Sequence, residues 1–185
     1  MRADARRNRD RIVEVARDLI RAKGYDAVSM DEVARTAGIG AGTLYRHFPT
    51  KDALHDAVIE AWADKVNEAV DQAMELDVPA RDRLLQWLKD YTAMLTTHQG
   101  AAARITASLG VAGSPYEAKC QTYLQANQRV IDALGGQLRP DVQAMQMCRL
   151  VGGVAAVADN SELPPEAVSA MLEVLTDGFL APKAA

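Results

Sequence analysis

Cysteine, histidine and aromatic residues are scarce in this sequence of 185 residues, which has two cysteines, three histidines and 5% Phe, Trp and Tyr. The two thiols, Cys120 and Cys148, lie within helical patterns, which favours buried free cysteines over a disulfide. The histidines and cysteines show no metal-ligand spacing, and neither a nucleophile elbow nor a phosphate-cradling loop is present. We therefore expect no catalytic site, no metal ion and no cofactor.

Long hydrophobic runs are absent as well. The longest apolar run, LVGGVAAVA from Leu150 to Ala158, is far shorter than the about 18 residues of a membrane-spanning helix. The charged N-terminus, MRADARRNRDR, is not followed by the apolar stretch of a signal peptide. These two absences predict a cytoplasmic protein.

Positive charge is concentrated at the N-terminal end. Residues 1–51 hold 11 Lys and Arg against 7 Asp and Glu, and the remaining residues hold 10 against 18, which gives +4 and −8 within the net charge of −4. A basic head on an acidic body fits a protein that presents one end to a polyanion. Chance clustering of so few charges is the alternative, so the asymmetry only supports a nucleic-acid partner.

The hydrophobic periodicity is helical almost throughout, with no alternating strand pattern and no internal repeat. Gly24 stands at an expected C-cap, and Ser29 with Glu32 forms a capping box. Pro49 ends one helix, and Thr50 can cap the next. We predict an all-α fold of about nine helices. They cover residues 8–23, 30–37, 41–48, 51–75, 80–97, 101–109, 115–135, 141–160 and 165–180.

The stretch GIGAGTLYRHFPTKDAL, residues 38–54, combines turn-forming glycines with the apolar anchors Leu44 and Phe48. It follows the short helix predicted at residues 30–37, and Gly38 supplies the positive φ that a tight turn between two helices needs. With Leu44 and Phe48 facing inward, the second short helix keeps its polar and basic side chains outside. Such a pair forms a helix-turn-helix, whose second helix can lie in the major groove of DNA.

The segment from Ser29 to Glu32 and the following AGIGAGTLYRHFPTKDAL closely resemble the DNA-binding domain of the tetracycline-repressor (TetR/AcrR) family. The core GTLYxHFxxK is far more specific than a generic helix-turn-helix, and the resemblance covers about residues 8–55. It implies an N-terminal three-helix DNA-binding domain at residues 1–54. A C-terminal helical domain for effector binding and dimerisation then follows at residues 55–185.

The resemblance also implies roles for single residues. Phosphate contacts fall to Ser29, Tyr45, His47 and Lys51. Positions at or near base edges fall to Thr43 and Arg46. The alternative for Tyr45 and His47 is packing or capping within the small domain. The whole expected DNA-binding surface comprises Ser29, Gly40, Ala41, Gly42, Thr43, Tyr45, Arg46, His47 and Lys51.

Two positions depart from the family pattern. Gly40 stands where serine is frequent and Ala41 where a polar or basic residue is frequent, so direct base readout rests on fewer side chains. Before the domain lies a basic arm that either adds phosphate or minor-groove contacts or is a disordered tail. The arm consists of Arg2, Arg6, Arg7 and Arg9.

For the C-terminal domain the resemblance implies a homodimer whose interface is formed by the last two helices. Two helices from each subunit would make a four-helix bundle with two-fold symmetry. The alternative is a monomeric core that uses the same apolar stripe. The predicted interface residues are Val151, Ala155, Val168, Met171, Leu172, Leu175 and Phe179.

The resemblance further implies a small-molecule cavity among the middle helices. Apolar walls with a few polar groups describe such a pocket, and polar residues interrupt the apolar stripes at Asn127 and Arg149. The alternatives are core packing for the aromatic residues and an internal ion pair for Arg149. The candidates for effector binding are Trp87, Tyr91, Tyr123, Asn127 and Arg149.

Together these expectations describe a sequence-specific, DNA-binding transcriptional regulator. It would be a dimeric repressor that reads a roughly palindromic operator with the helix at about residues 41–48 and is released by a small molecule. The long helix from residue 51 joins the two domains and is the expected lever between effector and DNA. Four alternatives remain: an activator, an enzyme whose site assembles only in the folded chain, a redox sensor using Cys120 and Cys148, and a helical adaptor that does not bind DNA.

Overall fold

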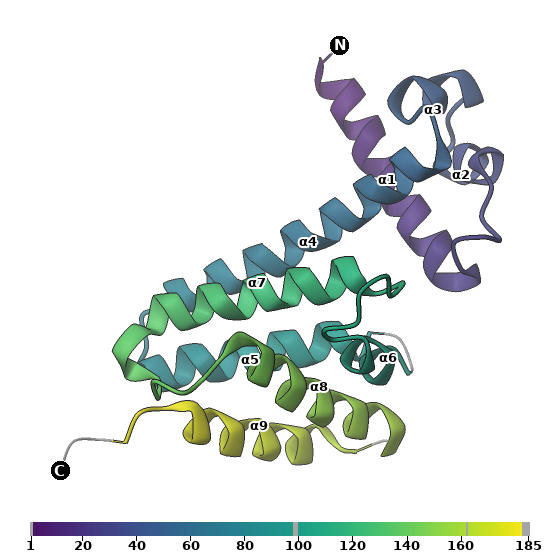
Figure 1. The fold of residues 1–185 in the computed structure, drawn as a ribbon. Helices are drawn as coiled ribbons and strands as arrows, with labels where there is room; N and C mark the ends of the chain where they lie inside the picture. The colour runs from purple at the N-terminus through teal and green to yellow at the C-terminus, as the bar shows by residue number, and fades with distance from the viewer. Residues whose placement is uncertain (1, 98–99, 162, 183–185) are drawn as a thin grey trace. The chain divides into compact units, whose positions relative to one another are not determined.

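The chain folds into helices in the computed structural model, which describes residues 2–97, 100–161 and 163–182 (Figure 1). Within these ranges there is no β-strand, and the only β-type backbone pairing is a single antiparallel bridge between Leu138 and Leu180. The chain divides into two compact units, Met1–Asp64 and Lys65–Ala185, which we call the N-terminal unit and the C-terminal unit. The predicted all-α fold class is confirmed.

The helices follow the predicted order. The N-terminal unit contains α1 (Arg2–Lys23), α2 (Met30–Ala37) and α3 (Ala41–His47). The long helix α4 (Lys51–Glu75) begins in this unit and ends in the C-terminal unit. The C-terminal unit adds α5 (Ala80–Leu95), α6 (Ala101–Ala107), α7 (Glu117–Leu134), the short 3₁₀ helix η1 (Gly135–Gln137), α8 (Ala144–Ser161) and α9 (Pro165–Phe179).

Two helix starts differ clearly from the prediction. Helix α1 begins at Arg2 and not at residue 8, so the basic arm is a helical extension, with Asp4 in its first turn and an ion pair from Arg7 to Asp4. Helix α8 begins at Ala144 and not at residue 141. The chain before it is held by other bonds, because the Arg139 N–H donates to Phe179 O at 2.9 Å and its guanidinium pairs with Asp141.

The core of the N-terminal unit lies where α1, α2, α3 and the first turns of α4 meet. Ile12, Val33 and Leu44 have no exposed surface, and Phe48 is 3% exposed. Burying side chains of this size stabilises the fold by about 1.5–3 kcal/mol each. The inward orientation predicted for Leu44 and Phe48 is confirmed, and it fixes which face of α3 is left outside.

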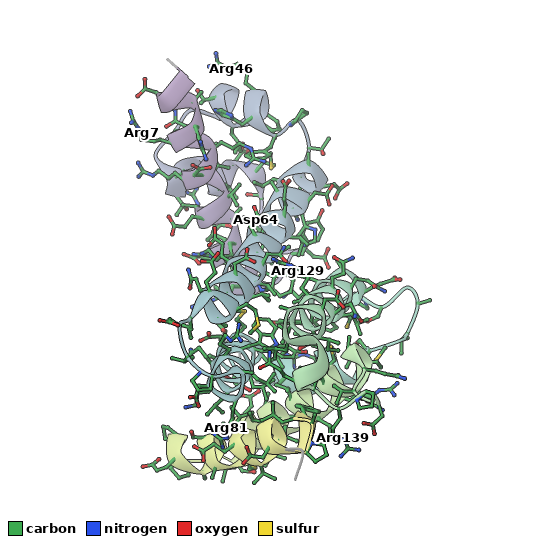
Figure 2. All side chains as sticks on the ribbon, turned by 90° about the vertical axis from the view of Figure 1, so that its left-hand side faces the viewer. Arg7, Arg46, Asp64, Arg81, Arg129 and Arg139 are labelled. Carbon is green, nitrogen blue, oxygen red and sulfur yellow. The ribbon has the colours of Figure 1, made fainter. Side chains whose placement is uncertain are left out.

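Helix α8 is central to the C-terminal unit, because it packs against α5, α6, α7 and α9. Two polar contacts on the surface of this unit join further pairs of helices, and Figure 2 labels their arginines, Arg81 and Arg129. Arg81 of α5 pairs with Asp177 of α9, with Nε 2.6 Å from Oδ1. Arg129 of α7 donates to Asn67 Oδ1 at 2.9 Å and to Asp71, both on α4. Across the described residues, no helix combines the length and apolarity needed to cross a bilayer.

Candidate nucleic-acid interface

The turn between α2 and α3 is built by local signals in the sequence. The Ser29 hydroxyl accepts a hydrogen bond from Glu32 N at 3.2 Å and caps α2. Gly38 ends α2 with a φ of 67°, a left-handed conformation that glycine adopts without strain. After the turn, the Thr50 hydroxyl accepts from Ala53 N at 3.0 Å and starts α4. These caps fix the end of α2 before α3 and the start of α4 after it, and so orient α3.

The outer face of α3 carries most of the residues predicted to touch DNA, while Ser29 precedes α2 and Lys51 begins α4. Leu44 is fully buried, whereas its neighbour Tyr45 is 47% exposed, and the Tyr45 hydroxyl has no hydrogen-bond partner among the described residues. The other predicted positions divide into two groups. Ser29, Gly40, Ala41, Gly42 and Arg46 are exposed. Thr43, His47 and Lys51 are half-buried.

Arg46 and Thr43 form one polar group on this face. The guanidinium of Arg46 lies along its own helix, with Nε donating to Gly42 O at 3.1 Å and Nη2 to Thr43 Oγ1 at 3.2 Å. Figure 2 shows the side chain of Arg46 at the surface of the N-terminal unit. Because these bonds are local and exposed, they cost little to exchange for bonds to another acceptor.

Ser29 is also placed for an outside contact. Its neighbour Glu32 is engaged by Lys23, whose Nζ donates to Oε1 at 2.5 Å and lowers the pKa of the Glu32 carboxyl. Glu32 therefore contributes to the start of α2 through its backbone N–H, while its carboxylate closes an ion pair with α1. The hydroxyl of Ser29 accepts in the cap and keeps its own O–H as a donor.

Lys51 is held in place by a residue that the sequence did not single out, Tyr25. The Lys51 ammonium lies 4.3 Å from the centre of the Tyr25 ring and donates to Asp26 O at 3.3 Å. The Tyr25 hydroxyl donates to the Asp52 carboxylate, and this bond raises the pKa of Tyr25. Lys51 and Tyr25 are far apart in sequence, and no periodicity relates the loop before α2 to the start of α4.

The basic arm is partly used within the N-terminal unit. The Arg9 guanidinium lies 5.5 Å from the centre of the Phe48 ring and 3.7 Å from the Glu60 carboxylate. Arg7 pairs with Asp4, and Arg6 is exposed. The side chain of Arg2 lies outside the described residues. The disordered-tail interpretation is wrong for the described part of the arm, because that part is helical.

Four of the five predicted effector residues meet in the middle of the C-terminal unit. Trp87 and Tyr91 of α5 stack with ring centres 5.5 Å apart, and the rings of Tyr91 and Tyr123 are 4.4 Å apart. Asn127 accepts from Trp87 Nε1 at 2.9 Å and donates to Tyr123 O at 2.9 Å. We call Trp87, Tyr91, Tyr123 and Asn127 the aromatic cluster. All of its side chains are at most 1% exposed, and burial raises the pKa of both tyrosines.

The fifth candidate, Arg149, lies elsewhere. It is exposed on α8 and lines a surface cleft of about 420 Å³ together with Arg139, Asp141 and Phe179. Its neighbour Cys148 points inward instead and accepts from Asn127 Nδ2 at 3.2 Å. The predicted internal ion pair for Arg149 is therefore wrong, because the side chain is exposed and not inside the unit.

The two thiols are free and buried, as predicted. Burial raises the pKa of both Cys120 and Cys148, which disfavours the thiolate that reacts with oxidants. The Cys120 thiol donates to Ile105 O at 3.4 Å. These surroundings are those of packing residues, and they give no support to the redox-sensor alternative.

The residues predicted to form the dimer interface divide into a buried group and a half-buried group. Val151, Ala155, Leu172 and Phe179 are at most 5% exposed and pack inside the C-terminal unit. Side chains with so little exposed surface offer almost nothing to a second copy, so these four pack mainly in the core of their own subunit. Val168, Met171 and Leu175 are half-buried.

A different face of α8 and α9 is apolar and open to solvent. Leu150 is 46% exposed, Val157 49% and Val174 71%. On the same two helices, an added Cβ at Gly153 or Gly178 would meet nothing within 4 Å. We call Leu150, Gly153, Val157, Val174 and Gly178 the apolar face. The sequence did not reveal this face, because apolar residues occur on more than one side of both helices.

A groove of about 720 Å³ lies elsewhere on the C-terminal unit, between α5, α8 and α9. Its walls are largely apolar, with Lys89 and Asp159 among the lining residues. Asp159 is engaged there by the Gly100 N–H. None of the five predicted effector residues lines this groove.

Two protein-family models match the chain. Residues 12–58 match the model described as bacterial regulatory proteins, tetR family. Residues 79–181, more than half of the chain, match the C-terminal domain model of SbtR-like transcriptional regulators. The first match contains α2, α3 and the start of α4, and the second contains α5 to α9.

Known relatives agree with both models. An HTH-type transcriptional regulator of Staphylococcus aureus is 37% identical over 102 residues, covering 51% of this chain and 55% of that protein. The chain thus spans about half the length of the curated relatives it matches.

Solved structures extend the agreement to nearly the whole chain. The TetR transcription regulatory protein from Mycobacterium vanbaalenii is 31% identical, with a TM-score of 0.62, and the match covers 97% of this chain and 99% of that one. A TetR regulator from Streptomyces coelicolor is 27% identical, also with a TM-score of 0.62, over 95% of this chain and 99% of that one. With the capped α2–α3 pair, the family models and these relatives in agreement, the chain belongs to the TetR family of DNA-binding transcriptional regulators.

Proposed function

We propose that this regulator is a homodimeric repressor that reads a roughly palindromic operator with α3 and leaves it when a small molecule binds the C-terminal unit. The observation that carries the proposal is the division of α3 into two faces. Leu44 is buried beneath the helix, while Tyr45 and Arg46 stand exposed on its outer side. A short helix anchored in this way can enter a major groove without giving up its own core.

Phosphate contacts would fix the position of α3 on the duplex. The donors proposed for them are Ser29, Tyr45, His47 and Lys51. The exposed phenol of Tyr45 and the O–H of Ser29 are free to donate, and Lys51 adds a positive charge. Such contacts supply affinity and register but carry no sequence information.

Base readout would rest on Thr43 and Arg46. The Arg46 guanidinium can exchange its bonds to Gly42 O and Thr43 Oγ1 for bonds to a base edge, most favourably to guanine. Gly40, Ala41 and Gly42 have no long side chains, so the helix start can approach the groove closely but reads little by itself.

Dimerisation would use the apolar face of α8 and α9. Glycine in a helix interior, such as Gly153, costs about 1 kcal/mol relative to alanine, and neither Gly153 nor Gly178 in the last turn of α9 is required by a neighbour in its own protomer. Close approach of a second copy explains both glycines and the exposure of Val157 and Val174 together. Two copies related by a two-fold axis would present two α3 helices to an operator with matching half-sites.

Effector binding would involve the aromatic cluster, without Arg149. Because Trp87, Tyr91 and Tyr123 are almost completely buried, a ligand could enter only if the helices around them separate. A ligand that binds this opened state alone shifts the population towards it. Helix α4, which belongs to both units, would carry the change to the DNA-binding end. The protein would act in the cytoplasm, where its operator is accessible.

Footprinting on the DNA upstream of the gene for this protein tests the proposal. We expect a protected, roughly palindromic site, and we expect Tyr45→Ala to lose protection at concentrations that saturate the unaltered protein. Arg21→Ala is the matched control, because this exposed cation lies in the last turn of α1, away from α3 (Figure 1). Equal protection by Tyr45→Ala, or no protected site at all, would contradict the proposal.

A further inference from the structure

We propose that Tyr25 is a positioning residue for DNA binding: its ring holds the ammonium of Lys51 ready for a phosphate before DNA arrives. The inference rests on the proposed phosphate contact of Lys51. Tyr25 lies in the loop between α1 and α2, outside the nine residues predicted to touch DNA.

Tyr25 is itself held by two contacts of its side chain and one of its backbone. The Tyr25 hydroxyl donates to the Asp52 carboxylate. The ring of His55 lies 4.7 Å away at an interplanar angle of 58°. Tyr25 O accepts from Val28 N at 3.3 Å, which closes the loop in front of α2. Asp52 and His55 both come from the first turns of α4, so Tyr25 is tied to the helix that carries Lys51.

This geometry restricts Lys51 without using all of its donors. An ammonium 4.3 Å from a ring centre makes a cation–π contact, and one N–H donates to Asp26 O. A lysine ammonium has three N–H groups, so two remain for a phosphate oxygen. A free lysine side chain loses rotamer entropy when it binds, and a side chain already ordered by the ring loses less.

The neighbouring acidic residues explain why it matters that Tyr25 holds the Lys51 ammonium in place. The Tyr25 site is surrounded by the carboxylates of Asp26, Asp52 and Asp56. These would repel a phosphate, and an unrestrained lysine would have several acidic partners within reach. The hydroxyl of Tyr25 engages one of them, Asp52, while the ring keeps the ammonium in place.

The experiment combines a double-mutant cycle with salt titrations of operator binding. We expect Tyr25→Leu to weaken binding about three- to fivefold, because the side chain of Lys51 would then have to be ordered when DNA binds. It should also reduce the salt dependence towards that of Lys51→Ala, which loses about 0.9 in slope with one phosphate contact. Tyr25→Phe, which keeps the ring, should stay close to the unaltered protein. Tyr25→Leu in a Lys51→Ala background should have no further effect.

A second readout follows the geometry without DNA. The ring current of Tyr25 should shift the NMR resonances of the Lys51 ε-methylene upfield in the unaltered protein and in Tyr25→Phe. They should return to ordinary values in Tyr25→Leu. This comparison separates a lost ring contact from a loss of folding, which would move resonances throughout the unit.

The outcomes separate the inference from the proposed function. If Lys51→Ala weakens binding but Tyr25→Leu does not, or if Tyr25→Leu weakens it equally in the Lys51→Ala background, Tyr25 does not position Lys51. If Tyr25→Phe is as weak as Tyr25→Leu, the ring is not responsible, and the inference fails as well. If Lys51→Ala and Tyr45→Ala both bind like the unaltered protein, the proposed DNA contacts themselves are wrong.

Discussion

Asn127 makes hydrogen bonds to three polar groups inside the apolar core of the C-terminal unit. Its Oδ1 accepts from Trp87 Nε1, and its Nδ2 donates to Tyr123 O and to Cys148 Sγ. A buried amide is tolerated only when its donors and acceptors are used, and here one side chain joins α5, α7 and α8. The residue therefore specifies how the aromatic rings pack around it.

Replacing this amide should be costly. Asn127→Ala leaves the Trp87 N–H buried without an acceptor and opens a small cavity, so we expect the free energy of unfolding to fall by about 2–3 kcal/mol. Urea unfolding followed by tryptophan fluorescence measures the change. Gln128→Ala, one residue on and exposed, should change it by less than about 0.5 kcal/mol. Equal stability of the two variants would show that the Asn127 bonds do not support the core.

At this scale the sequence predicts residue types better than contacts. Asn127 was visible as the polar exception in an apolar stripe, and Tyr45 as an outward neighbour of Leu44. The direction of Arg149 was not predictable, because it sits beside Cys148 in a run where many positions are apolar. Tyr25 was missed because its partners come from α4 and meet it only in the folded unit.

The packing of α6 against α8 depends on the absence of one side chain. A Cβ added at Gly152 would lie 2.2 Å from Thr106 Oγ1 and 3.1 Å from Thr106 Cβ. Rotating the threonine cannot relieve the second contact, because the Cβ is fixed to the backbone of α6. Gly152 is therefore required by the neighbouring helix, in contrast to Gly153, which faces open space.

Gly152→Ala should force the two helices apart. We expect a loss of about 1–3 kcal/mol in the free energy of unfolding, the usual effect of overpacking. The double variant Gly152→Ala, Thr106→Ala removes Oγ1 and Cγ2 from the contact and should recover part of the loss, although Thr106→Ala also gives up the bond from Thr106 Oγ1 to Ala102 O. Chemical unfolding of the single and double variants checks this. A double variant less stable than the sum of both singles would contradict the close approach.

Element order and type followed from periodicity and caps, but the faces of α8 and α9 did not. In helices α1 to α3, charged residues mark the outside, so the buried positions such as Leu44 can be read directly. In α8, both Val151 and Leu150 fit an apolar stripe, and only the packing against four other helices decides which is buried. The predicted dimer stripe consequently mixed core residues with half-buried ones.

For the molecule as a whole, the apolar face of α8 and α9 predicts that two copies associate into a dimer. Val174→Asp and Val157→Glu place a charge on surface that is already exposed, so each subunit should still fold. We expect both variants to shift the protein from dimer to monomer, as measured by light scattering during size-exclusion chromatography.

Val111→Glu is the matched control for these variants. Val111 is 53% exposed in the loop between α6 and α7, outside the two helices that carry the apolar face, and the charge there should leave the dimer intact. Dimers that persist in both Val174→Asp and Val157→Glu would place the interface elsewhere.

The salt dependence of operator affinity tests the central claim, that α3 and its neighbours bind the DNA. Fluorescence anisotropy with the footprinted duplex would compare the unaltered protein, Tyr45→Ala and Lys51→Ala, with Arg21→Ala as control. We predict weaker binding for both variants, with the slope of log affinity against log salt reduced by about 0.9 only for Lys51→Ala, because only lysine neutralises a phosphate. Identical affinities and slopes for all four proteins would contradict the account.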